Sequence, residues 1–196
     1  MSTSESSYEL IYVPYAPSRG EHVRLILEEI GVPYSDTTWL GWDTAFAQIQ
    51  EVLKGQDGNP PYYAPPLFKH DDLIISQTSN ILMYIGGRHG LSGATPEDAF
   101  RVNALVCTAL DGLSDEVHAT HHPIAKMLNY EDQKDASLIA ATEWFKMRLP
   151  KIFAYWQSVF DNKGGPWLLG ETFTCADLVL SQVGYPPHNK FLSNVC

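Results

Sequence analysis

Hydroxyl side chains stand at two places where an apolar run gives way to a helical pattern. Tyr12 stands next to the end of the first apolar run, and Tyr15 and Ser18 follow that run before an amphipathic stretch begins. Thr78 holds the equivalent place after a later run, directly behind Gln77. The first N–H groups of a helix are unpaired and carry partial positive charge, so a hydroxyl beside them can help to stabilise an anion. Helix starts of this kind can supply the field for a bound anion even in an acidic protein.

Three histidines lie close together in the sequence, at His118, His121 and His122. Positions i and i+4 share one face of a helix, which would suit a pair of metal ligands. The HExxH order typical of zinc proteases is absent, however, and nothing implies a further ligand. We therefore interpret them as helix-end or interface histidines and expect no metal.

Composition bounds the class of protein. The 196 residues are 44% hydrophobic and 18% charged, which is ordinary for one large or two small globular domains. Thirteen basic against 23 acidic residues give a formal charge of −10, which argues against nucleic acid as a partner. No apolar run is long enough to span a bilayer and the first residues are not signal-like, so we expect a cytoplasmic protein without a membrane partner. The cysteines are widely spaced without C-x-x-C, which excludes a dithiol redox site or a cysteine-rich zinc site: Cys107, Cys175 and Cys196.

Short apolar runs alternate with helical patterns up to about residue 91. Ser18 and Glu21 have the spacing of a capping box, and Gly31 stands where that helix should end. The predicted elements are strands at 8–13 and 33–39, helices at 18–30, 44–53 and 78–89, and a hairpin at 67–75. This βαβ-(α)-ββα order, with the first two strands parallel, predicts an α/β domain of the thioredoxin type at residues 1–90.

Beyond a linker at 90–94 nearly everything is helical, which predicts an all-α helical bundle at residues 91–196. Thr95 and Pro96 are a cap residue and a proline at the first helical position. Long amphipathic stretches follow at 96–118 and 133–160, with no strand pattern between them. Thr174 and Asp177 have the spacing of a further capping box, for which we expect a structural role.

Four segments in order resemble one family. YELIYVPYAPSRGEHVRLILEEIGVPY is similar to the first strand and helix of sigma-like glutathione transferases, above all the fungal members. APPLFKHDDLIISQTSNILMYIGGRHGL resembles that family's segment with a cis-proline, a hairpin and a γ-glutamyl site. HHPIAKMLNYEDQK and PWLLGETFTCADLVL resemble its helical domain. The resemblance covers residues 8–183. Since such relatives continue with further helix, we expect the second domain to be truncated at its end.

The resemblance implies that Tyr12 stabilises the thiolate of bound glutathione. A free thiol has a pKa near ~8.5, and each unit of depression takes about 1.4 kcal/mol. A hydroxyl donor and the next helix N-terminus can together supply about one or two units. Tyr15, where theta- and delta-like relatives place a serine, and Ser18 remain alternatives, because one extra residue separates Tyr12 from Arg19. Capping-box spacing favours a cap for Ser18. No cysteine lies in this stretch, so the protein-thiol chemistry of omega-like relatives is excluded.

Contacts to glutathione itself are also implied by the resemblance. Pro66 matches the cis-proline, and Pro65 before it can offer only its carbonyl, because proline lacks an N–H. Gln77 and Thr78 match the pair that holds the γ-glutamyl end. The candidates for the glycyl end are Trp39, Trp42 and Lys54, and of these we expect Trp39 to pack against the sheet instead.

Function and partners follow from the same resemblance. The leading expectation is an enzyme that adds glutathione to a hydrophobic electrophile, which would lie beside Val13, Tyr15 and His118. One alternative is a glutathione-dependent isomerase or tailoring enzyme of fungal secondary metabolism, in which the thiolate adds reversibly. Another is a non-catalytic binding module. We also expect a homodimer in which Asp111 completes the partner's γ-glutamyl site, unless Asp111 is a solvated helix acid or Cys107 occupies that place.

Overall fold

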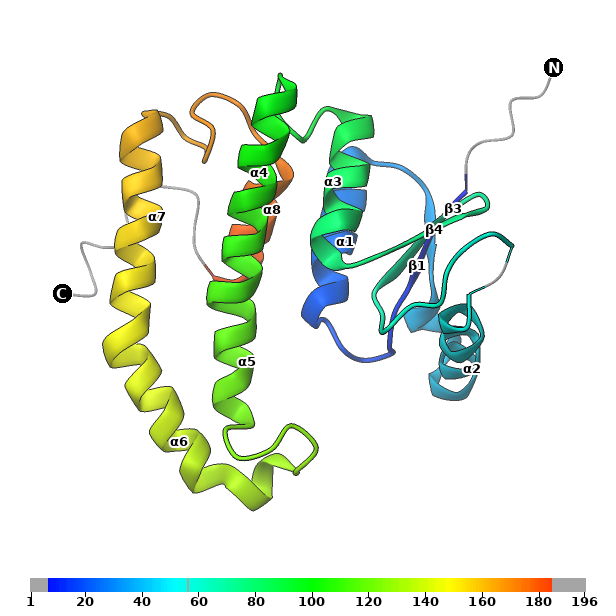
Figure 1. The fold of residues 1–196 in the computed structure, drawn as a ribbon, viewed down its shortest axis with the longest axis horizontal. Helices are drawn as coiled ribbons and strands as arrows, with labels where there is room; N and C mark the ends of the chain where they lie inside the picture. The colour runs from blue at the N-terminus through cyan, green and yellow to red at the C-terminus, as the bar shows by residue number, and fades with distance from the viewer. Residues whose placement is uncertain (1–6, 56, 185–196) are drawn as a thin grey trace. The chain divides into compact units, whose positions relative to one another are not determined.

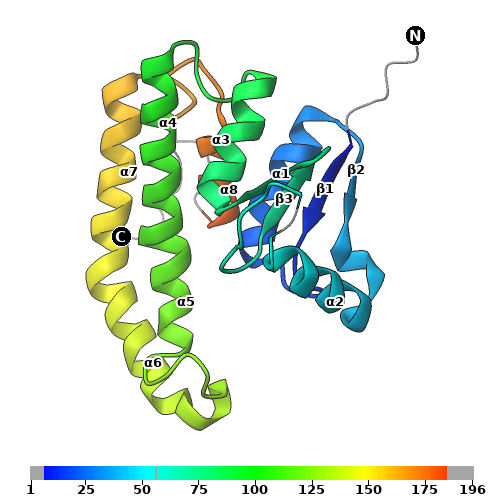
Figure 2. The same cartoon turned by 45° about the vertical axis from the view of Figure 1, so that its right-hand side comes forward.

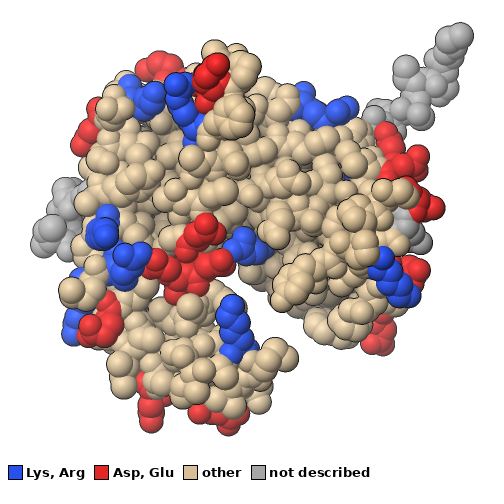
Figure 3. Space-filling model, in the orientation of Figure 1, with Lys and Arg blue, Asp and Glu red and all other residues tan. Residues whose placement is uncertain are grey.

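The computed structural model describes residues 7–55 and 57–184 (Figure 1). The chain divides into two compact units, residues 1–92 and 93–196. The truncation expected at the C-terminus, together with Cys196, falls on residues 185–196, outside the described residues. None of the described helices is both long and apolar enough to cross a bilayer. On the face shown in Figure 3, basic side chains are scattered among acidic ones and form no continuous area.

A four-stranded mixed sheet in the order β2-β1-β3-β4 forms the centre of the first unit. Its strands are β1 (Tyr8–Ile11), β2 (Tyr34–Asp36), β3 (Leu67–His70) and β4 (Leu73–Ser76). β1 is parallel to β2 and antiparallel to β3, and β3 and β4 form the predicted hairpin. The thioredoxin-type α/β fold is therefore confirmed, including the parallel first pair.

Helices cover both faces of this sheet. Figures 1 and 2 show α1 (Ser18–Ile30) and α3 (Thr78–His89) on one face and α2 (Trp42–Leu53) on the other. Ile11 and Leu67 pack with Ile49 of α2 in one apolar cluster. Because successive side chains of a strand point to opposite faces, Leu10 and Tyr12 face α1 and α3. Helix ends follow the sequence signals, since Gly31 and Gly90 adopt the left-handed conformation after α1 and α3.

The start of α1 differs from the sequence prediction. Pro17 is its N-cap residue and no side chain caps it, so the predicted capping box of Ser18 and Glu21 is wrong. Ser18 is itself the first helical residue, with φ 30°. The Glu21 carboxylate accepts a hydrogen bond from Arg24 at 2.9 Å instead. A basic residue one turn along the helix competes successfully for the carboxylate that the box required.

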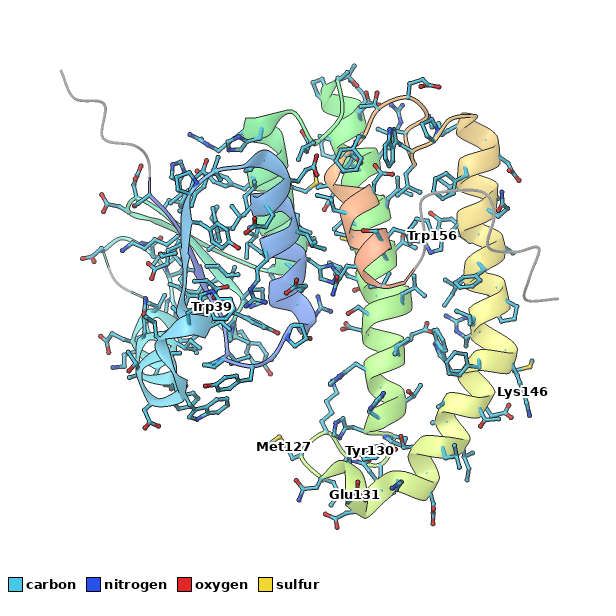
Figure 4. The ribbon with its side chains drawn as sticks, turned by 180° about the vertical axis from the view of Figure 1, so that it is seen from behind. Trp39, Met127, Tyr130, Glu131, Lys146 and Trp156 are labelled. Atoms are coloured by element: carbon cyan, nitrogen blue, oxygen red, sulfur yellow. The ribbon has the colours of Figure 1, made fainter. Side chains whose placement is uncertain are left out.

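Trp39 also departs from the prediction that it packs against the sheet. β2 stops at Asp36, whose side chain accepts from the Thr38 N–H and starts the 3₁₀ turn η1 (Thr37–Leu40). This turn directs Thr37 inward, with 1% of its surface exposed, and leaves Trp39 81% exposed. Figure 4 labels Trp39 on this turn.

Two long helical stretches and one short helix make up the described part of the second unit, as predicted. The first stretch comprises α4 (Pro96–Ala109), η2 (Leu110–Asp115) and α5 (Glu116–His121). The second comprises η3 (Tyr130–Gln133), α6 (Lys134–Glu143), η4 (Trp144–Arg148) and α7 (Leu149–Lys163). α8 (Cys175–Gln182) packs against α4. Figure 4 shows the fully buried Trp156 pointing from α7 toward these helices.

Each long stretch contains one π-helical segment, η2 and η4, which the amphipathic periodicity did not predict. Pro150, at the start of α7, lacks the N–H for an intrahelical bond, so a change of pitch just before it has a local cause. The two stretches are tied together beside these segments. Glu116 accepts from the Trp144 indole at 3.0 Å and from Arg148 Nε at 2.9 Å. The bond from Arg148 lowers the pKa of the Glu116 carboxyl.

Capping boxes begin both α4 and α8, at Thr95 with Asp98 and at Thr174 with Asp177. The buried Asp177 carboxylate accepts from the backbone N–H groups of Leu168 and Thr174, each at 2.8 Å. Burial raises the pKa of Asp177, and these donors oppose the rise. Asp177 thus joins the loop before α8 to the first turn of that helix, which is a structural role.

Candidate functional site

Three of the predicted features meet at one end of the sheet because of strand register. Ile11, the last residue of β1, is opposite Leu67 of β3, and Leu67 is opposite Ser76 of β4. Tyr12 follows the first of these strands, Pro66 precedes the second, and α3 starts directly after the third. The sheet therefore brings the strand-end tyrosine, the proline turn and a helix N-terminus to one edge.

Tyr12 is held tightly at this edge, with 7% of its surface exposed. Its ring lies directly on Gly20 of α1, since a Cβ at that glycine would come 2.4 Å from Tyr12 Cδ1 and 2.9 Å from Cε1. The guanidinium carbon of Arg24 lies 6.0 Å from the ring centroid. The ring is thus fixed by a residue without a side chain and lies next to a cation.

Arg24 is itself anchored from three directions. Its Nε donates to Asp36 Oδ2 at 2.6 Å, one terminal nitrogen donates to Glu21 at 2.9 Å, and the other donates to Thr38 Oγ1 at 2.6 Å. Burial lowers the pKa of the guanidinium, but the bonds to Asp36 and Glu21 outweigh burial and hold it above its ordinary value. A permanent positive charge therefore stays beside Tyr12 at every accessible pH.

The main chain of Tyr12 is bound by a side chain. The Thr37 hydroxyl accepts from the Tyr12 N–H at 2.9 Å and donates to the Tyr12 C=O at 2.8 Å. Both residues are buried. No sequence pattern predicted this pair, because residue 37 fell inside a stretch predicted as strand. Gly20 and Arg24 were missed too, although a glycine in the first turn of an otherwise apolar helix face marks a close approach.

The N-terminus of α3 is open for an anion. Gln77, its N-cap residue, has φ 70° and gives no side-chain cap. Thr78 is 1% exposed, and among the described residues its hydroxyl oxygen has no hydrogen-bond partner. A hydroxyl beside the first N–H groups of a helix can donate, together with them, to an anion that binds there. Gln77 is exposed beside it.

The Pro65–Pro66 peptide bond is cis, as the sequence predicted. Pro66 is buried and Pro65 is half-buried at the start of β3. Neither proline has an N–H, so this turn offers only carbonyl oxygens to a ligand.

The alternatives to Tyr12 are Tyr15, on the loop before α1, and Ser18, the first residue of that helix. Tyr15 is 82% exposed with φ 60°, and Ser18 is exposed with φ 30°. Val13 points the other way from Tyr12, since it packs against the cluster under α2. Of these four side chains only Tyr12 is buried against α1.

Trp42 and Lys54 lie at opposite ends of α2. Twelve helical residues span roughly 18 Å along the axis, so the two cannot both hold one small carboxylate. Trp42 follows η1 through Gly41 and stacks on Phe46, with ring centroids 6.3 Å apart. The Lys54 ammonium pairs with Glu51. The structure therefore does not bring these two predicted site residues together.

A small cavity of about 80 Å³ lies on the face of the sheet that α2 covers. It is lined by Glu9, Ile11, Gln48, Val52, Asp57, Asn59, Lys69, Asp72 and Ile74. None of the predicted site residues contributes to it, so it is separate from the edge that holds Tyr12.

Other titratable groups can be placed as well. Burial, and then the charge of Arg19, lower the pKa of His22 to about 4, so this α1 imidazole is neutral at pH 7. Burial raises the pKa of the Cys175 thiol to about 12, which leaves it protonated and unreactive. His118 is exposed on α5, with its ring 5.5 Å from that of His122. Within residues 7–55 and 57–184, no three His, Cys, Asp or Glu side chains are arranged to hold a metal ion.

Comparison with known proteins gives the following relatives. Residues 118–191 match the sequence profile of the glutathione S-transferase C-terminal domain. Glutathione S-transferase P 1 of Xenopus laevis is 24% identical over 90% of this chain and 74% of its own length. Glutathione S-transferase A4 of Homo sapiens is 26% identical over 88% of this chain and 70% of its own length.

Solved structures share the fold. Prostaglandin synthase D of Nilaparvata lugens superimposes with a TM-score of 0.70 at 17% identity, covering 90% of this chain and 79% of that one. A Nu-class glutathione S-transferase from Haemonchus contortus gives 0.69 at 18% identity, covering 97% and 85%. At such identities the likeness concerns the fold.

The contact between Gly20 and Tyr12 predicts opposite effects for one substitution at two helical glycines. Gly20→Ala should lower the free energy of unfolding by about 1–3 kcal/mol, because the new methyl group overlaps the Tyr12 ring. Gly87→Ala on α3 should raise it by up to about 1 kcal/mol, since its nearest neighbour is Ser92 Oγ at 3.9 Å. Urea unfolding of both variants is the measurement. Equal stability of the two variants would contradict the close packing of Tyr12 on α1.

Proposed function

We propose that this chain, a member of the glutathione S-transferase superfamily, binds glutathione at the sheet edge of its first unit and activates the thiol for addition to an electrophile. The observation that carries the proposal is the meeting of Tyr12, the cis-proline turn and the uncapped N-terminus of α3 at one edge. Each supplies a kind of contact that a different part of the tripeptide needs.

The γ-glutamyl end is assigned to the start of α3. Its carboxylate accepts hydrogen bonds from the first N–H groups of the helix and from the Thr78 hydroxyl. The carboxylate thereby gives the buried Thr78 hydroxyl a hydrogen-bond partner. The exposed Gln77 amide faces the ammonium group through its carbonyl oxygen. An anion at a helix N-terminus is favourable by about 0.3–1 kcal/mol beyond these hydrogen bonds.

The thiol is assigned to the edge beside Tyr12. On binding, the S–H proton leaves to solvent, the Tyr12 O–H donates to the sulfur anion, and the sulfur lone pair forms a bond to the electrophilic carbon. Either a leaving group departs with its bonding electrons, or an unsaturated substrate takes up a proton. Arg24 lies over the Tyr12 ring, but its charge is paired with Asp36 and Glu21, so we assign the stabilisation of the thiolate to the Tyr12 hydroxyl.

The middle and glycyl parts of glutathione have fewer partners. The Pro65 carbonyl can accept from the cysteinyl N–H, but no donor for the cysteinyl carbonyl exists there, which weakens binding by about 0.5–1.5 kcal/mol. For the glycyl end we favour Trp42 over Lys54, because Trp42 directly follows the turn whose Thr37 binds Tyr12.

The electrophile is assigned to the exposed loop that carries Tyr15, whose ring is free to meet an apolar substrate. Val13 is a poorer candidate, because it packs beneath α2, while His118 stays a candidate on resemblance alone. Assignment to the sigma-like, fungal type rests on the sequence motifs, whereas the relatives matched are Pi, Alpha and nematode proteins. Reversible addition, as in an isomerase, would use the same thiolate. A non-catalytic module would bind glutathione without lowering the pKa of its thiol.

Tyr12→Phe tests the activation step. Removing the hydroxyl should raise the pKa of the bound thiol by about one unit and lower turnover of a chromogenic electrophile by about tenfold or more, with little change in glutathione affinity. Thiolate absorbance followed against pH is the measurement. Tyr15→Phe is the matched control and should titrate like the wild type. If Tyr15→Phe alone changes the titration, the activating hydroxyl is Tyr15.

Thr78→Val tests the γ-glutamyl assignment. The substitution keeps the shape of the buried side chain but removes one contact to a charged group, so affinity for glutathione should fall by about 1–3 kcal/mol. Calorimetry measures the change. Ser79→Ala, on the next residue of α3, is the control for general effects on the helix. Wild-type affinity in Thr78→Val would remove the assignment.

A homodimer is proposed from the same superfamily membership, with Asp111 of one subunit near the γ-glutamyl site of the other. Asp111 is exposed on η2, and Cys107, the other residue at the required place, is half-buried one turn earlier. Light scattering over a dilution series should give twice the 21.9 kDa mass at micromolar concentration. A monomer throughout would defeat the proposal, and wild-type glutathione affinity in Asp111→Asn would remove the role of this carboxylate.

A further inference from the structure

The two hydrogen bonds between Thr37 and Tyr12 occupy a special place in the sheet. The parallel ladder of β1 and β2 pairs residues 8 to 10 with residues 34 to 36, and it stops there because the chain turns into η1. Tyr12 directly follows β1, and its N–H and C=O point toward the side of β2 like those of Tyr8 and Leu10, since these groups alternate along an extended chain. In a longer ladder, two backbone groups of β2 would bind them.

A single side-chain oxygen replaces those two backbone groups. Thr37 Oγ1 accepts from the Tyr12 N–H at 2.9 Å and donates its proton to the Tyr12 C=O at 2.8 Å. A hydroxyl is the smallest group that can do both at once. The side chain is 1% exposed, so water cannot take over either bond.

Tyr12 depends on this side chain because little else can fix its main chain. Beyond Tyr12 the chain leaves the sheet through a loop in which Tyr15 has positive φ, and α1 then begins at Ser18, which also has positive φ. The ring is limited on one side by Gly20, which allows no retreat toward α1. A displacement of the Tyr12 backbone would therefore be passed directly to the phenol hydroxyl.

We propose that Thr37 is a positioning residue for the thiolate-stabilising tyrosine, and that it acts by extending the β1–β2 ladder through its side chain. The inference rests on the proposed function, because it concerns where the Tyr12 hydroxyl stands relative to the glutathione sulfur. A misplacement of about 1 Å at a reacting centre can cost about a hundredfold in rate. A small displacement of residue 37 therefore changes the reaction rate through the position of the Tyr12 hydroxyl, although residue 37 does not contact the substrate.

The test compares Thr37→Val, which keeps the shape and removes both bonds, with Thr37→Ser, which keeps the hydroxyl. Thr37→Val should raise the pKa of the bound thiol by about half to one unit and lower kcat about tenfold or more, with KM for glutathione changed less than about twofold. Thr37→Ser should restore both quantities to near the wild-type values. Thr120→Val is the matched control: it removes the hydroxyl of another buried threonine, which donates to the Val117 carbonyl at 2.7 Å, and it leaves the Tyr12 backbone bonds in place.

A purely structural role for Thr37 gives a different result. In that case Thr37→Val would melt at a lower temperature, as Thr120→Val should, but its thiol titration would match the wild type, and the inference would be overturned. If Thr37→Val does not fold, Thr37→Cys replaces it, since a thiol is a weaker donor and acceptor. A wild-type titration in Thr37→Cys would likewise overturn the inference. If glutathione bound to the wild-type protein shows no lowered thiol pKa, the proposed function itself fails, which is a separate outcome.

Discussion

The rest of this site depends on one constraint, the register that aligns the termini of β1, β3 and β4 at one edge of the sheet. Ile11, Leu67 and Ser76 stand opposite one another across the sheet, and every predicted glutathione contact at this edge is the next or second residue beyond one of them. A shift of one residue in β1 would turn Tyr12 to the face of α2 and bring Val13 toward α1. The apolar cluster of Ile11, Ile49 and Leu67 prevents that shift, because it would expose these side chains. The packing under α2 thus fixes the chemistry on the opposite face.

Much of this could be predicted from the sequence, and the reason is the same register. Hydrophobic periodicity located the strands and α3, and turn residues such as Gly31 and Gly90 marked helix ends by their need for positive φ. The predictions that were wrong concern side chains for which neighbouring groups compete as hydrogen-bond partners. Ser18 and Glu21 have the spacing of a capping box, but Arg24 takes the carboxylate. Trp39 was expected against the sheet, but Asp36 bonds the Thr38 N–H and turns the chain away. Spacing alone does not rank such competitors.

The residues around Tyr12 were the hardest part of the site to predict. Thr37 comes from η1, whereas Gly20 and Arg24 come from α1, and each matters through its position relative to the Tyr12 ring or its peptide groups. A threonine after a short strand and a glycine inside a helix are common in sequences and carry no chemistry of their own. Their roles exist only once the tertiary structure places them beside Tyr12, so a sequence motif could identify the tyrosine but not the residues that position it.

Helix capping differs between the unit that carries the proposed site and the helical unit. The three α-helices of the first unit begin without a side-chain cap, whereas α4 and α8 of the second unit begin with complete boxes. A cap is worth about 0.5–2 kcal/mol, so leaving α1 and α3 uncapped lowers the stability of the free protein. The same omission leaves their first N–H groups unpaired at the edge where Tyr12 and Thr78 lie, and a bound anion can then take the place of the cap. On this view glutathione completes two helix starts that the sequence leaves open, and its binding should stabilise the first unit more than the second.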